Sequence, residues 1–191
     1  LALASDSGVI DLTAPSVQIN NINDTQDTTP TITGNAQDVP AGSIISVVIT
    51  DFDGQTQTLL TQTNADGDWS IDVTSPLAEG QFEVDASVSD AAGNQAQANN
   101  QGVVDLTNPD ITVTAIADTN DTTPTFVGRV EDAPAGSVIT VLVTDINGNV
   151  QTLTTLLNED GTWSVDASEI LPGGEFTATA SVTDAAGNEA S

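Results

Sequence analysis

The chain has 191 residues, of which 28 are acidic and only one, Arg129, is basic, so its net charge at pH 7 is −27. A chain this negative repels nucleic acid and anionic membrane surfaces, and we expect neither as a partner. Without cysteine or lysine it can form neither disulfides nor Lys–Asn isopeptide crosslinks, which leaves bound metal as the means of stiffening a small β domain. No apolar run approaches the roughly 18 residues needed to span a bilayer, so we expect no membrane insertion.

Strand patterns follow one another along the first half of the chain. Apolar and polar residues alternate at 32–36, 45–49, 69–73 and 82–88, and a period of two is typical of strands with one buried face. Turn signals such as Asp-Gly and Gly-Asn separate these segments. The residues predicted to point inward are Ile32, Gly34, Ala36, Ile45, Val47, Ile49, Trp69, Ile71, Val73, Phe82, Val84, Ala86 and Val88. About seven short strands of this kind predict an immunoglobulin-like (Ig-like) β-sandwich and leave its strand topology open.

The whole pattern occurs twice with a period of 94 residues, seen in the pairs Asp11 and Asp105, Pro30 and Pro124, Trp69 and Trp163, and Asp90 and Asp184. A fixed period without insertions is typical of tandem repeats. We therefore predict an all-β chain of two tandem Ig-like β-sandwich domains, repeat 1 at 11–104 and repeat 2 at 105–191, arranged end to end as a rod. Residues 1–10 align with 95–104, so we interpret them as the orphan last strand of a preceding repeat. By the same alignment the last strand of repeat 2 is truncated.

Recurrent loop motifs give the chain a specific resemblance. They are DLTAP and DLTNP, NDTQDTTPTITG and NDTTPTFVG, DVPAGS and DAPAGS, ADGDWS and EDGTWS, and DAAGN in both copies. With these motifs the chain resembles the bacterial Ig-like extender repeats of giant type I-secreted RTX adhesins and biofilm-associated surface proteins. The resemblance implies a secreted, cell-surface stalk that is rigidified by calcium and projects a ligand-binding tip away from the bacterium.

The repeated loop carboxylates are candidate calcium ligands. Loops of a sandwich collect at its two poles, so we expect several structural Ca²⁺ ions at both poles and at the junction with the neighbouring repeat. Calcium takes six to eight oxygens at about 2.3–2.6 Å, which Asp-rich loops and their carbonyls can supply. The sequence does not distinguish calcium from another hard cation. The candidate ligands are Asp11, Asp24, Asp27, Asp38, Asp51, Asp53, Asp90, Asp105, Asp118, Asp121, Asp132, Asp145, Asn147, Asp184 and Asn188.

Simpler interpretations compete with some of these assignments. A loop Asp is commonly a turn former because it hydrogen-bonds its own backbone, and we interpret Asp66 and Asp160 in this way. Trp69 and Trp163 are in phase with buried strand residues, which favours a core role over stacking on sugars. Outward Thr residues are interpreted as strand formers rather than as an ice-binding array. The lack of His, Cys and Lys leaves a Ser or Thr nucleophile without a base, so we expect no enzyme.

A second functional hypothesis is that the chain is an adhesive binding module in its own right. Such a module would bind carbohydrate, or would pair with its own kind as cadherins do. The phasing of the repeats adds an expectation about association. Residues 1–10 either fray or fill the open edge of a neighbouring second domain by head-to-tail strand addition. A split first strand within repeat 1 is the alternative.

Overall fold

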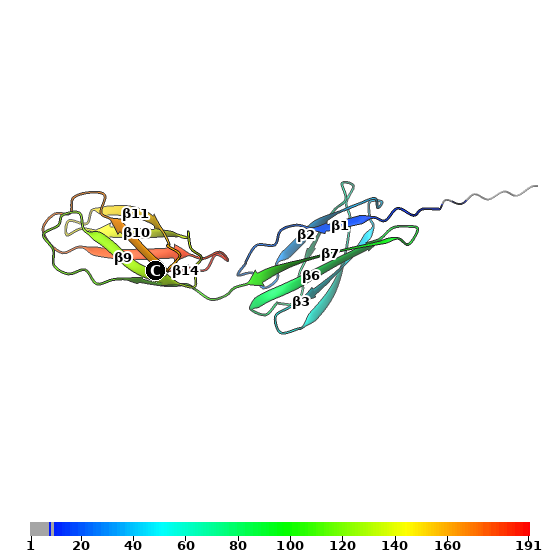
Figure 1. Ribbon diagram of the computed structural model, residues 1–191, viewed down its shortest axis with the longest axis horizontal. Coiled ribbons are helices and arrows are strands. Elements are labelled where there is room, and N and C mark those ends of the chain that lie inside the picture. The colour runs from blue at the N-terminus through cyan, green and yellow to red at the C-terminus, as the bar shows by residue number, and fades with distance from the viewer. Residues whose placement is uncertain (1–7, 9) are drawn as a thin grey trace, which may run out of the picture. The chain divides into compact units, whose positions relative to one another are not determined.

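The computed structural model describes residue 8 and residues 10–191, and their contacts divide the chain into two compact units, Leu1–Val104 and Asp105–Ser191. Throughout the described part of the chain the regular elements are strands, all paired antiparallel in sheets (Figure 1). The predicted all-β fold of two tandem Ig-like domains is confirmed. The strand predicted at 1–10 lies outside the described residues except for Gly8 and Ile10. Within the described part, no helix has the length and apolar character needed to cross a bilayer.

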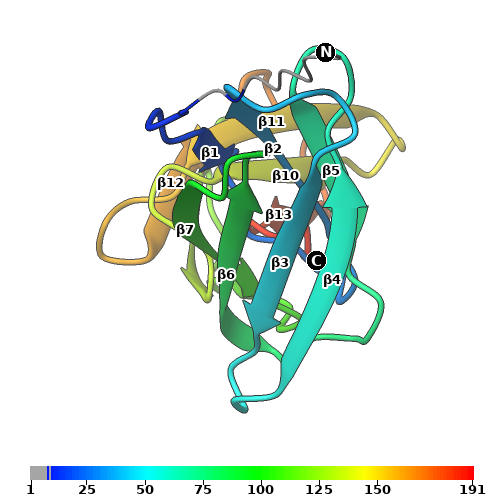
Figure 2. The same cartoon turned by 90° about the vertical axis from the view of Figure 1, so that its right-hand side faces the viewer.

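Unit 1 is a sandwich of a three-stranded and a four-stranded sheet. The first sheet has the order β1-β2-β5 and the second β4-β3-β6-β7; Figure 2 looks toward this four-stranded sheet. The seven strands are β1 (Ser16–Ile19), β2 (Thr31–Gln37), β3 (Ile44–Thr50), β4 (Thr56–Gln62), β5 (Asp68–Asp72), β6 (Gly80–Ser89) and β7 (Gln95–Val104).

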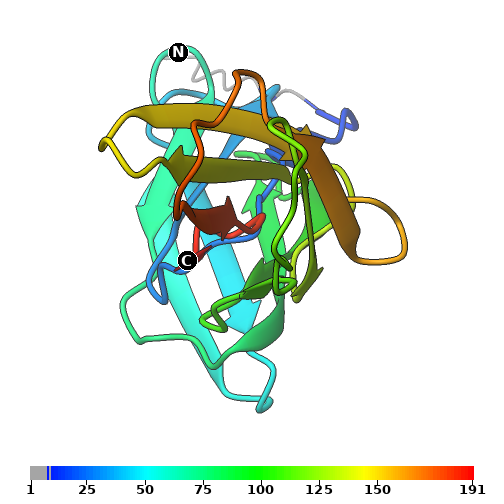
Figure 3. The same cartoon turned by 90° about the vertical axis from the view of Figure 1, so that its left-hand side faces the viewer.

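Unit 2 repeats this arrangement, with one difference at its last strand. Its sheets have the orders β8-β9-β12 and β11-β10-β13-β14 (Figure 3). The strands are β8 (Asp110–Val113), β9 (Thr125–Glu131), β10 (Val138–Thr144), β11 (Val150–Leu156), β12 (Thr162–Asp166), β13 (Thr177–Thr183) and β14 (Glu189–Ala190). Whereas β7 has ten residues, β14 has two, so most of the edge of β13 has no neighbouring strand among the described residues.

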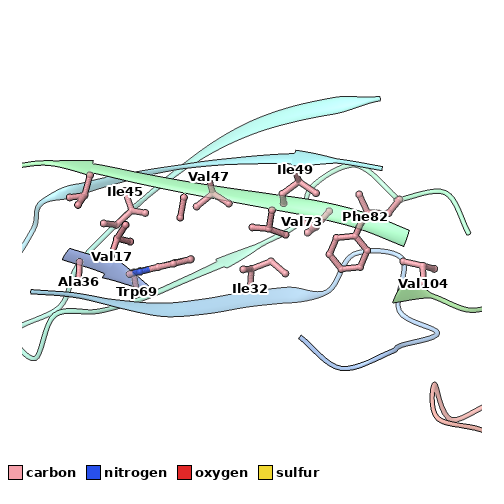
Figure 4. Packing of buried hydrophobic residues seen from close by; sticks show 14 residues of the cluster. Val17, Ile32, Ala36, Ile45, Val47, Ile49, Trp69, Val73, Phe82 and Val104 are labelled. Carbon is pink, nitrogen blue, oxygen red and sulfur yellow. The ribbon is translucent and has the colours of Figure 1, made fainter. Parts of the chain in front are cut away.

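The core of unit 1 lies between its two sheets and uses the inward residues that the alternation predicts. Ile45, Val47 and Ile49 of β3 are 0% exposed, and they face Ile32 and Trp69 of the opposite sheet (Figure 4). The corresponding core of unit 2 is built around Trp163 and Phe126. The interpretation of both tryptophans as core residues is confirmed, because Trp69 is 3% and Trp163 is 1% exposed.

Each tryptophan packs over a glycine in the adjacent strand. Gly34 of β2 stands opposite Trp69, and a Cβ at position 34 would overlap the Gln18 carbonyl oxygen and the indole ring. Gly128 has the same relation to Trp163 in unit 2. Glycine is needed at both positions because the indole occupies the volume where any side chain would begin.

Candidate functional site

The hairpin between β6 and β7 holds one candidate carboxylate in a dense set of hydrogen bonds. The Oδ1 of Asp90 accepts from the backbone N–H groups of Ala92 and Asn94, both at 2.9 Å. Its Oδ2 accepts from the Asn94 side-chain amide at 2.8 Å. These bonds, the Asn94 amide first, favour the charged form and place the pKa of Asp90 below its ordinary value.

The Asn94 amide also ties this hairpin to the segment that leads into β1. Its Nδ2 donates to the carbonyl oxygens of Asp11 at 3.2 Å and Thr13 at 3.1 Å. One amide nitrogen is therefore within hydrogen-bonding distance of a carboxylate oxygen and two main-chain carbonyls. The candidate residues Asp11 and Asp90 meet here at Asn94, which the sequence analysis did not name as a ligand, and Asp11 contributes its carbonyl to this group. The Asp11 carboxylate instead accepts from the Thr13 N–H at 2.9 Å.

Unit 2 reproduces this oxygen group around Asn188, which is only 5% exposed. Its Nδ2 donates to the Asp105 carbonyl and to Oδ2 of Asp184, both at 2.9 Å. Oδ1 of Asp184 accepts from three backbone N–H groups, those of Ala186, Gly187 and Asn188. Partial burial of Asp184 works to raise its pKa, but the hydrogen bonds from Asn188 and the backbone outweigh it, and the pKa lies below its ordinary value.

The loops after β3 and β10 use their carboxylates to close turns. Oδ1 of Asp51 accepts from the Gln55 N–H at 2.7 Å, and its Oδ2 is 3.5 Å from the Ala78 nitrogen. In unit 2 the Asn149 side chain and the backbone N–H groups of Asn147 and Asn149 donate to Asp145. These donors, the Asn149 side chain first, lower the pKa of Asp145.

The other candidate ligands are not part of the oxygen groups around Asn94 and Asn188, and each is described by its own local contacts. Asp27 and Asp121 accept from the backbone and hydroxyl of the threonine two residues later. Asp38 and Asp132 have positive φ angles of 59° and 58°, in the left-handed region that turns require. The remaining four candidates, all exposed side chains, are Asp24, Asp53, Asp118 and Asn147.

The turn interpretation of Asp160 agrees with its contacts. Its Oδ1 accepts from the hydroxyl of Thr162 at 2.6 Å and from the Thr162 N–H at 3.0 Å. The single cation of the chain, Arg129, donates to the Asp160 carbonyl at 3.2 Å. The Thr162 hydrogen bonds, with a smaller contribution from the Arg129 charge, lower the pKa of Asp160.

Carboxylates alone do not form a metal centre in this structure: across residue 8 and residues 10–191, no group of three acidic side chains comes close enough to hold an ion. The oxygen groups around Asn94 and Asn188 depend on main-chain carbonyls that sequence reasoning did not single out, namely those of Asp11, Thr13 and Asp105. A usable signal was present, because the Asn that ends DAAGN recurs with the same spacing as the DLT motif. Whether the candidate ligands bind a metal stays a prediction.

Comparison with protein families gives a single result for both units. The family model described as the bacterial Ig-like domain matches residues 1–106 and again residues 100–191. The chain belongs to the bacterial Ig-like domain family. No curated protein sequence is significantly similar to these two bacterial Ig-like domains.

Several solved structures are similar to this bacterial Ig-like chain. A tetra-tandem repeat from the extending region of a large adhesion protein is 30% identical over 92% of this chain, with a TM-score of 0.45. A Ca²⁺-stabilized adhesin with which an Antarctic bacterium binds ice is 28% identical over 93%, with a TM-score of 0.44. A 1.5-MDa bacterial ice-binding adhesin is 24% identical over 94%, with a TM-score of 0.43. The chain spans 46%, 46% and 62% of these three structures, respectively.

Proposed function

We propose that this chain is an extender module of a bacterial cell-surface adhesin, and that bound calcium stiffens it outside the cell. Membership of both units in the bacterial Ig-like family and the unbroken 94-residue period support a spacer role. The neighbouring repeats of the same polypeptide are its partners. Secretion and display on the surface, adhesion and biofilm formation belong to this proposal, as does the absence of enzymatic activity.

The observation that carries the calcium proposal is the repeated oxygen group around Asn94 and Asn188. In each unit the side-chain amide of the DAAGN motif contacts a carboxylate oxygen and main-chain carbonyl oxygen from the first segment, two such carbonyls in unit 1 and one in unit 2. Rotation of the amide by 180° would present Oδ1 in place of Nδ2. The rotation is possible because the amide group has nearly the same shape when its oxygen and nitrogen are exchanged. The set would then consist of hard oxygen donors, which calcium prefers.

In unit 2 the residues that would hold the ion are Asp184, Asn188 and the carbonyl of Asp105. Calcium would supply positive charge to a chain whose net charge is −27, and would offset the mutual repulsion of its carboxylates. The other candidate loop carboxylates would bind further ions. Extracellular calcium modules commonly bind at about 10⁻⁴–10⁻³ M, so such a chain would be loose in the cell and stiff outside it.

The test is calorimetric unfolding with EDTA, with calcium and with magnesium. A calcium ion that binds only the folded state adds about 2.7 kcal/mol to the free energy of unfolding when free calcium is about a hundredfold above the Kd. For a unit of this size that corresponds to a rise in Tm of about 10–20 °C. Magnesium demands a tighter octahedron and should replace calcium poorly. Solution scattering should give a larger maximum dimension with calcium than with EDTA.

A pair of matched variants separates a ligand from a turn former. Asp184→Asn and Asp160→Asn both keep an oxygen that can accept the turn hydrogen bonds, and both remove one charge. We expect Asp184→Asn to lose most of the calcium-dependent rise in the Tm of unit 2, whereas Asp160→Asn should keep that rise. Equal responses of the two variants, or a Tm and a maximum dimension that ignore calcium, would refute the calcium proposal.

A further inference from the structure

The loop that joins β10 to β11 holds the pair Asn147-Gly148, and no other asparagine of the chain is followed by glycine. Glycine has no side chain to shield its backbone nitrogen, so this nitrogen can approach the side chain of the preceding residue closely. For this reason Asn-Gly is the dipeptide in which asparagine loses its side-chain amide most readily. The surroundings of Asn147 in the folded loop decide whether it reacts.

The Asn147 side chain is exposed, and the turn is closed by other groups. The Gly148 N–H donates to the Asp145 carbonyl at 3.0 Å. The backbone N–H groups of Asn147 and Asn149 donate to Oδ1 of Asp145, both at 2.8 Å, and the Asn149 side chain donates to its Oδ2. All of these bonds use the backbone or the side chains of Asp145 and Asn149. Asn147 can therefore lose its side-chain amide without breaking any of them.

Unit 1 shows that the same turn accommodates a carboxylate at this position. The residue equivalent to Asn147 is Asp53, whose side chain is also exposed. The Gly54 N–H donates to the Asp51 carbonyl at 2.9 Å, and the φ of Gly54 is 79° where that of Gly148 is 80°. An exchange of amide for carboxylate thus leaves the backbone of this turn as it is.

We propose that Asn147 is a site of spontaneous deamidation, which gives the loop of unit 2 the carboxylate that unit 1 has at Asp53. The backbone nitrogen of Gly148 loses its proton and attacks Cγ of Asn147. The bond from Cγ to the side-chain nitrogen breaks, and this nitrogen takes up a proton and leaves as ammonia, so that a five-membered succinimide remains. Water then opens the ring at one of its two carbonyls. The products are aspartate, or isoaspartate with the backbone running through Cγ.

The hydrogen bond from Gly148 to Asp145 slows this reaction without preventing it. The loop must open before the Gly148 nitrogen can attack, and an exposed loop opens locally at a lower free-energy cost than unfolding of the whole unit. Asn149 in the same loop is the internal reference. Its side chain and its N–H both donate to Asp145, and it precedes Val150, whose branched side chain crowds the backbone nitrogen. Asn149 should therefore keep its amide while Asn147 reacts.

The test is incubation of the full chain for several weeks in EDTA at mildly alkaline pH, which favours loss of the Gly148 proton. Anion-exchange chromatography follows the net charge, and mass spectrometry of proteolytic peptides locates the change. The same chain unfolded in urea is the reference for reaction without the turn. The variant Asn147→Gln removes the site, because glutamine would have to form a larger ring. The variant Asp53→Asn creates the same Asn-Gly pair in the equivalent turn of unit 1.

We expect the folded wild-type chain to gain one negative charge beyond its −27, with aspartate and isoaspartate both found at position 147. The urea-unfolded chain should react faster at the same position. Asn147→Gln should lose the gain in charge completely, and Asp53→Asn should react at positions 53 and 147. A folded wild-type chain that keeps the Asn147 amide while the unfolded chain loses it would overturn the proposal. A gain in charge that persists in Asn147→Gln would do the same.

Discussion

The substitution Gly128→Ala tests how tightly the tryptophan of unit 2 is packed. The added methyl group would overlap the carbonyl oxygen of Thr112 in β8 and would lie 2.5 Å from Cζ2 of Trp163. The Thr112 carbonyl belongs to the paired strand β8, and the indole is 1% exposed, so neither group can move without disturbing the sheet or the core. The strain must therefore be relieved by shifting backbone.

Overpacking of this kind costs about 1–3 kcal/mol. Alanine allows the unfolded chain fewer conformations than glycine does, and this effect stabilises the folded state by about 0.4–1 kcal/mol. The net loss is about 1–2 kcal/mol, and since 1 kcal/mol shifts the Tm of a domain of this size by about 4–8 °C, the unit 2 transition should fall by about 5–15 °C. The same argument applies to Gly34→Ala in unit 1, where Trp69 takes the place of Trp163.

Differential scanning calorimetry of the full chain can follow both units at once. Gly173→Ala is the matched control, because no atom lies within 4 Å of its added Cβ and its φ is not in the left-handed region. We expect the control to leave the unit 2 transition unchanged or slightly raised. If Gly128→Ala melts no lower than Gly173→Ala, the packing argument is wrong.

Further predictions concern pH and turn geometry. The pKa values of Asp145 and Asp184 in the folded chain lie below the ordinary 3.8, so their stabilising effect is complete above about that pH and is lost as pH falls through the lower folded values. Acid titration followed by circular dichroism should therefore show a flat neutral region and a cooperative loss below pH 3.8. Asp132 has a φ of 58°, which glycine adopts more readily than any other residue. Asp132→Gly should therefore raise the free energy of unfolding of unit 2 by up to ~1 kcal/mol, and its Tm with it, whereas Asp132→Val should lower that free energy by ~1–2 kcal/mol. A Gly variant less stable than wild type would show that the Asp132 side chain itself is needed.

The sequence predicted the strands and the core because both follow from local periodicity. Alternation at 82–88 assigns Phe82 and Val84 to the buried face, and both are 0% exposed. Hairpin turns were equally readable, since Asp-Gly and Gly-Asn pairs adopt the positive φ angles that such turns need, as Gly67 and Gly161 do.

The candidate site was predicted less completely, since its composition depends on contacts between distant segments. Asp184 and Asn188 are four residues apart, and their hydrogen bond could be inferred from the turn motif. The Asp105 carbonyl that shares the Asn188 amide is 83 residues away in sequence, and a backbone oxygen leaves no trace in residue identity. Two of the predicted ligands, Asp27 and Asp121, also accept a hydrogen bond from the backbone N–H of the threonine two residues later, and whether they bind a metal stays a prediction.

By itself, the sequence of this chain determined the repeat, the strand pattern and the requirement for counterions, since period, alternation and charge are properties of residue order alone. Only the tertiary structure decided which oxygens surround Asn94 and Asn188, and that Gly34 and Gly128 make room for an indole ring. The physical reason is that both depend on which strand lies beside which, and at what register. That pairing is set by packing the two sheets against each other, over sequence separations that no local pattern records.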